Sequence, residues 1–392
     1  MKNLMKNPLF VPLICLGLVL LFNLITNAGF FEISIKRNNV GNWILAGNLI
    51  SVFNNASELV ILAIGMTLIT SASGGQDISV GACVAIAGGV ILKILASKTG
   101  APVVVAVSLG CLVAMAFGAF NGILVSIFNI QPMVATLILF TAGRPISSWI
   151  TGGLSPRITN SVLDAVGNVI PGVPVPTPIF IAAFCVAFIF LTLRFTNLGL
   201  YAQAVGISDK AARLVGLSPR LVKFIQFVVM GLCVGLVAFI KVSRVGSIQY
   251  NYIAKDIEMD AILAVALGGN SLSGGRFSMT GSIIGAYTIQ AITTTLLANS
   301  VPSDALSAYK AVVIIILVVI QSPVVKDFWR KRRKNDPAQS SPSPSLNGSP
   351  SAPTGPQTAK PEANLGADLG SGLASSLGTG PGASLATSQG GA

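Results

Sequence analysis

The apolar positions of this chain gather into ten runs that are separated by polar segments. The runs lie near residues 9–26, 57–74, 77–97, 101–128, 132–151, 178–195, 223–242, 259–270, 279–299 and 307–323. Several approach the roughly 20 residues with which an α-helix crosses a bilayer. Because lipid cannot satisfy backbone polar groups, runs of this length predict helices. The pattern therefore predicts an all-α polytopic membrane protein of about ten transmembrane helices, some of them broken.

The distribution of positive charge predicts the orientation of these helices. An even number of crossings places both termini on one side of the membrane. Lysine and arginine concentrate at the N-terminus, in the loop 194–223 and in the cluster 326–334, which predicts that both termini are cytoplasmic. The first run follows Lys2 and Lys6 as a signal peptide would, but no convincing small-x-small cleavage site follows it, so an uncleaved helix is expected.

The composition changes sharply near the C-terminus. Residues 335–392 consist mainly of Ser, Pro, Gly, Ala and Thr, without an aromatic residue. Such a segment cannot bury enough apolar surface to offset its ordering entropy. We therefore expect a transmembrane domain over residues 1–334 and a disordered cytoplasmic tail over 335–392. The stretch 152–177, rich in Gly and Pro, is expected to be an extracytoplasmic loop.

Composition excludes several classes of function. Hydrophobic residues make up 52% of the chain and charged residues 10%, whereas soluble domains carry about 25% charged residues. The net charge of +12 follows the positive-inside pattern, so membrane lipid rather than nucleic acid is the expected surrounding. The chain has no histidine, and its five cysteines lie in apolar runs without CxxC spacing. They are expected to be small buried hydrophobic residues, and neither a metal site nor a bound cofactor is predicted.

Two glycine-rich segments interrupt the apolar pattern. In the first, Gly74 and Gly75 should end one helix, and Asp77 or Ser79 should cap the next. Broken helices with polar residues at membrane depth mark substrate paths in transporters, although a tight turn at the membrane surface is the alternative. The second segment, 268–276, has a similar texture. This similarity hints at an internal repeat, but its glycines and those that follow would also allow close helix packing.

A third interruption, the loop 196–222, predicts a short cytoplasmic helix. Ser208 is the expected N-cap, Gly216 the stop, and Ser218-Pro219 the start of the next helix. Spacing places three apolar side chains on one face of this helix, namely those of Ala211, Leu214 and Val215. In the cytoplasm this face has little to bury against, so it predicts contact with a partner subunit. The alternative is a helix that lies on lipid headgroups.

A few polar residues inside or beside the apolar runs are candidates to line a path. They are Gln76, Asp77, Ser79, Asn121, Gln131, Arg144 and Asn270. Most are uncharged donors and acceptors, which suit a hydroxyl-rich sugar. Arg144 is costly at membrane depth and should face protein or water, unless it lies near the outer interface and extends to the headgroups.

At these interruptions the sequence resembles the ribose-type sugar ABC permease family. The resemblance covers residues 57–323 in order, and the runs that carry it are 63–68, 74–81, 121–125, 130–137, 204–216 and 263–276. Within the family, the stretches 135–144 and 263–277 look most like the galactofuranose-type permeases. Two positions depart from the family pattern, which usually has an apolar residue at Gln76 and Asn at Ser208.

The resemblance implies the non-catalytic permease subunit of a bacterial inner-membrane ABC importer for a monosaccharide such as ribose, galactose or galactofuranose. The implied partners are cytoplasmic ATP-binding subunits, a periplasmic sugar-binding protein and a second permease copy or paralogue. The ATP-binding subunits would couple through Gly206, Ser208, Asp209, Ala211, Ala212, Arg213 and Gly216. The chain lacks a GxxxxGK[ST] run, so ATP would be bound by the partner subunits.

Three other functions are alternatives to a sugar permease. A branched-chain amino-acid ABC permease shares much of this architecture. An ion-coupled secondary transporter would need intramembrane ionisable relays, for which Asp77 and Asp260 are the best candidates. A membrane-embedded enzyme would need clustered acid, base or nucleophile groups, and the sequence shows no such cluster.

Overall fold

The computed structural model describes residues 9–37, 43–97, 100–155, 157–170, 172–302 and 305–321. The elements are α1 (Phe10–Thr26), η2 (Ala28–Phe31), β1 (Ser34–Arg37), β2 (Trp43–Ala46), α2 (Asn48–Ser73), α3 (Val80–Ala96), α4 (Val103–Ser126), α5 (Pro132–Thr151), α6 (Ser161–Gly167), α7 (Thr177–Phe195), α8 (Leu198–Ile207), α9 (Asp209–Leu214), α10 (Pro219–Val245), α11 (Ile257–Leu267), α12 (Met279–Ala298) and α13 (Leu306–Gln321). The predicted tail 335–392 and the basic cluster 326–334 lie outside the described residues.

Each of the ten apolar runs contains a helix, which confirms the predicted fold class. Within the described residues, six helices are long and apolar enough to span a bilayer, namely α2, α4, α5, α7, α10 and α12. Helices α3 and α11 are shorter, with 17 and 11 residues, and each adjoins one of the glycine-rich breaks. Each break therefore lies between one long helix, α2 or α12, and one short helix, α3 or α11, and no helix is lost from the bundle.

Three local features differ from the sequence prediction. Strands β1 and β2 form an antiparallel hairpin that pairs Ser34 with Ala46, and no strand was expected there. Helix α2 begins at Asn48, ahead of the predicted run 57–74. The hydropathy pattern missed its first turns because they are polar. The predicted loop 152–177 contains α6, whose N-cap Asn160 accepts a hydrogen bond from the backbone of Val162 at 2.9 Å.

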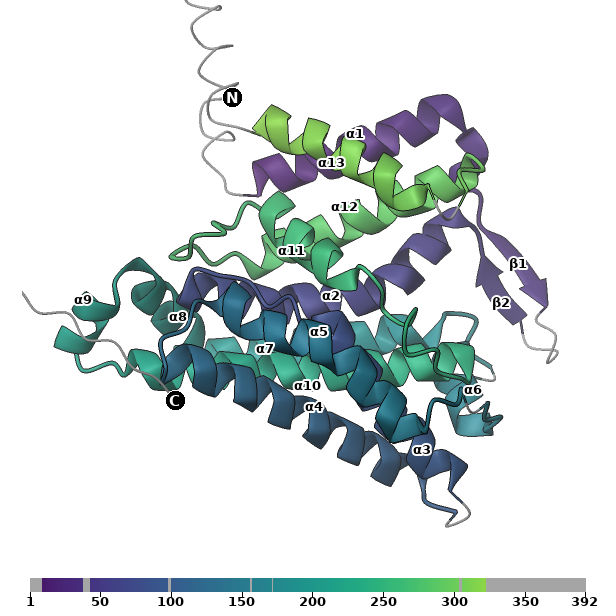
Figure 1. Ribbon diagram of the computed structural model, residues 1–392. Coiled ribbons are helices and arrows are strands. Elements are labelled where there is room, and N and C mark those ends of the chain that lie inside the picture. The colour runs from purple at the N-terminus through teal and green to yellow at the C-terminus, as the bar shows by residue number, and fades with distance from the viewer. Residues whose placement is uncertain are drawn as a thin grey trace, which may run out of the picture. The chain divides into compact units, whose positions relative to one another are not determined.

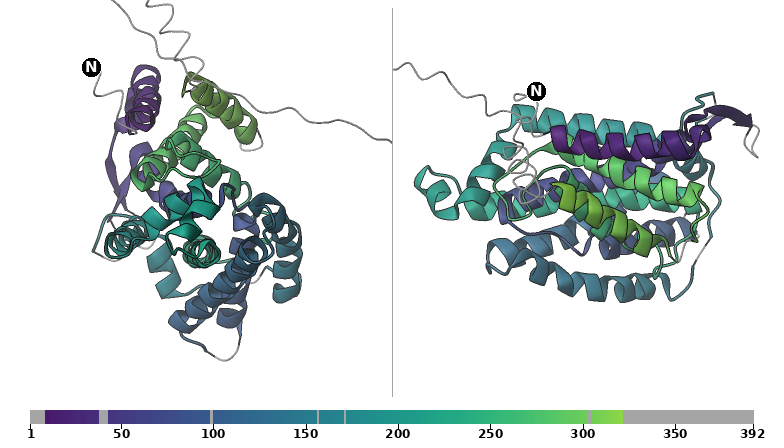
Figure 2. Two further views of the ribbon diagram at one scale, coloured as in Figure 1. Left: turned by 90° about the vertical axis from the view of Figure 1, so that its left-hand side faces the viewer. Right: turned by 90° about the horizontal axis from the view of Figure 1, so that it is seen from above.

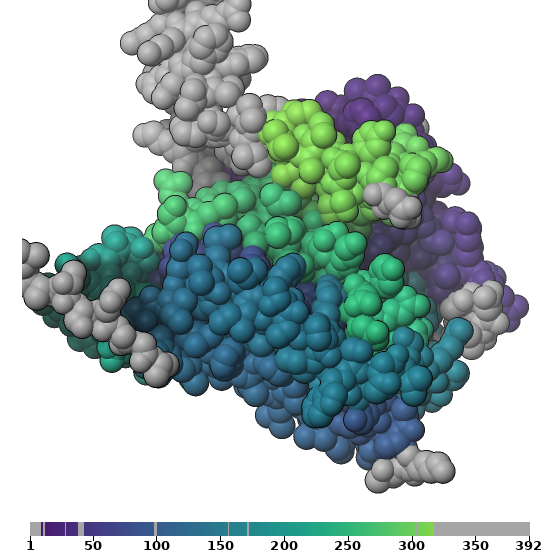
Figure 3. Space-filling model, viewed as in Figure 1, coloured from purple at the N-terminus to yellow at the C-terminus, as the bar shows by residue number. Residues whose placement is uncertain are grey.

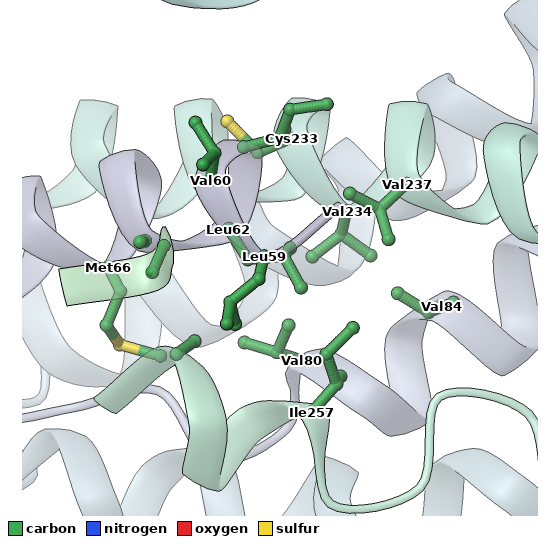
Figure 4. Packing of buried hydrophobic residues seen from close by; sticks show 14 of the residues in the cluster. Leu59, Val60, Leu62, Met66, Val80, Val84, Cys233, Val234, Val237 and Ile257 are labelled. Atoms are coloured by element: carbon green, nitrogen blue, oxygen red, sulfur yellow. The ribbon is translucent and has the colours of Figure 1, made fainter. Parts of the chain in front are cut away.

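Helices α2 and α10 form the centre of the bundle. Every residue from Ala56 to Ala72 is buried, and α2 packs against α7, α8, α10, α11 and α12. Figure 4 shows Leu59, Leu62 and Met66 of α2 near residues of α3, α10 and α11. Helices α1, α12 and α13 lie along one side of α2, and α4 lies along the far side of α10 (Figures 1 and 2). All five cysteines are buried, as the sequence predicted.

Glycines allow two pairs of helices to approach closely. A Cβ added at Gly118 of α4 would overlap the carbonyl oxygen of Phe227 in α10, and one at Gly231 would lie 2.6 Å from the carbonyl oxygen of Ala114. A Cβ at Gly285 of α12 would overlap the carbonyl oxygen of Ala264 in α11. Because lipid provides no hydrophobic drive between helices, such small-residue contacts are a main source of packing energy. The close-packing interpretation, made for the second break and the glycines that follow it, is confirmed for Gly285.

The two ends of the bundle carry different structures. Helices α8 and α9 project from one end, whereas the β1–β2 hairpin and α6 lie at the other end (Figures 1 and 2). The blue side chains of α4 and α5 cover one long face between these ends (Figure 3). The fold therefore places the predicted coupling loop at the opposite end from the hairpin.

Candidate functional site

The first break returns into the bundle instead of turning at its end. Gly74 ends α2 in a left-handed conformation with φ of 63°, and its N–H donates to the Thr70 carbonyl at 3.1 Å. The backbone N of Asp77 then lies 3.4 Å from the sulfur of Met66. Met66 is about 10 Å from the end of α2, at 1.5 Å per helical residue. Asp77 and the start of α3 therefore lie at depth in the bundle, which contradicts the alternative of a tight surface turn.

Asp77 organises the start of α3. Its Oδ1 atom accepts hydrogen bonds from the backbone N–H of Ser79 at 2.8 Å and from the Ser79 hydroxyl at 2.6 Å. Ser79 occupies the N-cap position, but its side chain makes no capping hydrogen bond. Of the two predicted caps, Asp77 is confirmed as the acceptor of a backbone N–H, whereas Ser79 caps nothing and its hydroxyl oxygen accepts from the Asn121 amide instead. The short Asp side chain instead satisfies a donor two residues ahead, as in an Asx turn.

A buried polar cluster surrounds Ser79. The side-chain amide of Asn121, on α4, donates to the Ser79 hydroxyl oxygen at 3.0 Å. The backbone N–H of Ile78 donates to the hydroxyl of Thr136, on α5, at 3.2 Å. The Oδ1 atom of Asn121 is buried and has no hydrogen-bond partner among the described residues. The structure thus brings the predicted residues Asp77, Ser79 and Asn121 together, and it adds Thr136.

Two other predicted path residues have different partners. The Nε2 atom of Gln76 donates to the carbonyl oxygen of Leu272 at 3.0 Å and so joins the two glycine-rich breaks. Asn270 donates to the hydroxyl of Ser282 at 2.8 Å, and Ser282 also receives a hydrogen bond from Thr67 of α2 at 2.6 Å. Thr67 and Ser282 were missed because single hydroxyl residues in apolar helices are a weak sequence signal.

The remaining predicted path residues lie apart from the cluster. Gln131 is exposed at the N-cap position of α5. Arg144 is partly buried and donates through Nη1 to the carbonyl oxygens of Tyr250 at 2.8 Å and Ile253 at 3.1 Å. Arg144 therefore faces protein, which was one of its two predicted environments. Its guanidinium fastens α5 to the segment between α10 and α11.

Ion pairs hold Asp260, which was a candidate relay, and Glu58, which the sequence analysis overlooked. Asp260 of α11 binds Lys310 of α13, with its two oxygens 2.6 and 2.8 Å from Nζ. Glu58 of α2 pairs with Lys241 at 2.7 Å and with Arg244 at 3.1 Å, both on α10. Glu58 was missed although it lies in the predicted run 57–74, because it stands at the first turn of that run, beside the polar segment that precedes it. Both sets of charges join helices to one another.

The pairing of Asp260 leads to a stability prediction. Replacing Lys310 with methionine should destabilise the protein, because it leaves an unpaired carboxylate that is largely buried. Loss of one partner of a buried pair costs about 3–5 kcal/mol. The double change Asp260→Asn and Lys310→Met should recover most of the loss, which thermal unfolding in detergent would measure. Equal stability of wild type and the Lys310→Met variant would contradict this structural role.

The predicted cap and stop of the cytoplasmic helix are present. The Ser208 hydroxyl oxygen accepts a hydrogen bond from the backbone N–H of Ala211 at 3.2 Å, which confirms the N-cap of α9. Gly216 follows α9 with φ of 82°, a conformation that favours glycine. Asp209 also forms a salt bridge of 2.6 Å with Lys223 of α10. These local interactions hold α9 at the entrance of α10.

Helix α9 has one buried anchor and an exposed apolar face. Ala212 is 2% exposed and packs in a small cluster with Ala72, Ala202, Val205 and Val222. Leu214 and Val215 are 89% and 76% exposed. Ala211 and Arg213 are exposed as well. The predicted apolar face is therefore confirmed as unsatisfied within the described part of the chain.

These features define a class of protein. A multi-pass helical bundle with re-entrant backbone, a buried cluster of amides and hydroxyls at depth, and a short exposed helix at one end is a transport permease. The model of the family described as the branched-chain amino acid transport system permease component matches residues 48–321. No solved structure matches the chain.

Curated relatives narrow this class. The galactofuranose transporter permease of Escherichia coli (strain K12) is 36% identical over 324 residues, which cover 82% of this chain and 92% of the relative. The fructose import permease FruF of Bifidobacterium longum (strain NCC 2705) is 33% identical and covers 83% and 91%, respectively. The ribose import permease of E. coli (strain K12) is 34% identical and covers 72% and 87%. This chain belongs to the ribose-type sugar ABC permease family and is a multi-pass inner-membrane protein.

Proposed function

We propose that the protein forms the membrane pathway of an ABC importer for a monosaccharide. The observation that carries this proposal is the buried cluster around Ser79, which presents amide and hydroxyl groups at depth in the bundle. Such groups exchange hydrogen bonds with sugar hydroxyls without introducing a net charge. The names of the relatives, which transport galactofuranose, fructose and ribose, support the same class of solute.

The alternative solutes and energy sources fit the site less well. A zwitterionic amino acid would need countercharges at depth, since an unpaired charge is costly there. The Oδ1 atom of Asp77 is already committed to Ser79, and Asp260 is committed to Lys310. An ion-coupled transporter would need one of these carboxylates to serve as a relay. Both instead have structural partners.

The energy would come from partner subunits. The exposed Leu214 and Val215 offer the apolar surface on which a cytoplasmic ATP-binding subunit would dock, within the predicted coupling segment 206–216. ATP would bind to that subunit, and this chain would hold no cofactor. A periplasmic sugar-binding protein would deliver the solute to the end of the bundle that carries α6 and the hairpin. A second permease copy or paralogue would complete the membrane assembly, and both termini would be cytoplasmic.

A gentle-detergent pull-down of the tagged chain from native membranes tests this proposal. We expect a P-loop ATPase to co-purify and the double change Leu214→Glu and Val215→Glu to remove it. Leu154→Glu provides a matched control, because Leu154 is an apolar residue that is 69% exposed and lies just after the C-terminal end of α5, away from α9. Uptake of labelled ribose, fructose and galactose should depend on ATP. Recovery of the protein alone, with uptake that follows an ion gradient, would contradict the proposal.

A further inference from the structure

The end of α8 lies directly against the end of α2. An ideal Cβ added to Gly206 would overlap the carbonyl oxygen of Ser71, and it would lie 2.7 Å from the backbone nitrogen of Gly275. Gly206 has an ordinary helical conformation, so its lack of a side chain serves this contact and not a special backbone angle. The contact joins backbone to backbone, with no flexible side chain between the two helices.

The second break meets the first at the same point. The N–H of Gly275 donates to the Ser71 carbonyl at 3.0 Å, and the Ser71 hydroxyl donates to the carbonyl of Arg276 at 2.7 Å. A Cβ on Gly274 would lie 3.1 Å from the Cα atom of Gly74 and 3.3 Å from the carbonyl oxygen of Gly206. Three segments that are distant in the sequence therefore meet through Gly74, Gly206, Gly274 and Gly275, which we call the glycine hub.

The glycine hub continues into the re-entrant segment 74–79. Gln76, two residues beyond Gly74, is bonded to Leu272 of the second break. Asp77 and Ser79 follow at once and lead to Asn121. Ala212 of α9 packs next to Ala72 in the last turn of α2. Only a few residues of chain separate Ala72 from Asp77 and the buried polar cluster.

We infer that the glycine hub transmits movement of α8 and α9 to the segment 74–79 and thereby opens the polar cluster around Ser79. The inference rests on the proposed function, because a partner must supply the movement. Close-packed interiors have low compressibility, so a displacement of α8 is passed to the backbone that it touches. Gly206 and Gln76 are accordingly positioning residues, whereas Asp77, Ser79 and Asn121 would meet the solute.

The Gly206→Ala variant provides the test. The added methyl group must move α8 from α2 by a distance on the order of 1 Å to reach ordinary separation. Alanine favours the helix, and the exposed face of α9 is unchanged, so docking should survive. Gly17→Ala is the matched control, because a Cβ at Gly17 of α1 has no neighbouring atom within 4 Å. We expect uptake to fall roughly tenfold or more in Gly206→Ala, as for typical coupling between sites. ATP hydrolysis should be retained in this variant. Uptake by Gly17→Ala should equal that of wild type.

Labelling of Cys83 reports movement at the cluster directly. Its sulfur lies 3.6 Å from the Ser79 hydroxyl oxygen, and it is buried. Labelling by a membrane-permeant maleimide would be followed by peptide mass spectrometry in nucleotide-free and vanadate-trapped complexes, with the buried Cys15 as reference. Trapping should change the labelling rate at Cys83 in wild type and in Gly17→Ala, but not in Gly206→Ala. The Gln76→Leu variant, which adds no clash, should weaken the change.

The outcomes separate this inference from the proposed function. If Gly206→Ala binds the ATPase and matches wild type in uptake and in Cys83 labelling, the inference about the glycine hub is wrong. The proposed function as an importer would still stand. A Cys83 rate that does not respond to trapping in wild type would also overturn the inference about the glycine hub. Loss of the bound ATPase from Gly206→Ala would assign Gly206 to docking and would overturn the transmission of movement through the glycine hub. Failure of the wild-type chain to bind any ATPase would instead overturn the proposed function.

Discussion

Replacing Ala212 with glutamate should abolish ATP-driven uptake, although the chain still inserts into the membrane. Ala212 is 2% exposed and packs against small apolar side chains that join α9 to α2, α8 and α10. A carboxylate placed among these apolar side chains would lose its hydration, and an uncompensated buried charge costs about 3–5 kcal/mol. A helix of six residues has too little stability of its own to offset this cost. We therefore expect α9 to detach from α2, α8 and α10.

Uptake by cells that express the variant, together with its amount in the membrane, measures this effect. A loss of about a hundredfold corresponds to roughly 3 kcal/mol, the lower bound of the burial cost. Leu154→Glu, which places the same charge on an exposed apolar residue, should transport normally. Gly206→Asp should also uncouple ATP hydrolysis from uptake, because it forces a side chain against the carbonyl of Ser71. Normal transport in both Ala212→Glu and Gly206→Asp would refute the coupling assignment.

Replacing Asp77 with alanine should lower uptake by about 5- to 150-fold, whereas Asp77→Asn should keep most of it. Alanine removes the oxygen that accepts from the backbone and the hydroxyl of Ser79. A buried donor without a partner costs about 1–3 kcal/mol. Asparagine retains an acceptor oxygen at the same distance from the backbone, so the start of α3 should keep its geometry.

The same pair of variants separates a hydrogen-bonding role of Asp77 from an ionic one. Initial uptake rates at matched protein levels, with and without an uncoupler, would be compared for both. If Asp77 served as an ion relay, the neutral asparagine would fail as completely as alanine, and uptake would collapse with the uncoupler. That result would favour the secondary-transporter hypothesis over the importer.

The relation between the branched-chain family model and the sugar relatives is informative about the fold. The family model matches residues 48–321, and the sugar permeases cover most of the same stretch. A shared helical frame therefore serves more than one class of solute. Under the proposed function, recognition of the solute would rest on a few groups at depth, such as those around Ser79, and these are a small part of any alignment.

Local chemistry made several features predictable from the sequence by itself. Ten apolar runs predicted ten helices because lipid forces each backbone to satisfy its own hydrogen bonds. Ser208 and Gly216 were identified as a cap and a stop because capping acts between residues three or four positions apart. The exposed face of α9 followed from helical spacing alone. The hairpin and α6 were missed because their short segments carry weak hydropathy signals.

Only the tertiary structure decided where the breaks lead. Hydropathy could not distinguish a surface turn from a re-entrant segment at 74–79, because both have the same local sequence. The contact of Asp77 with Met66 and the hydrogen bond from Gln76 to Leu272 depend on how α2 packs against α11 and α12. Asn121 meets Ser79 because α4 packs against α3, whereas Arg144 and Gln131 lie apart from the cluster. The sequence by itself determined the helices and their caps, whose causes act within a few residues. The site was decided by packing between segments up to 196 positions apart, which no local pattern encodes.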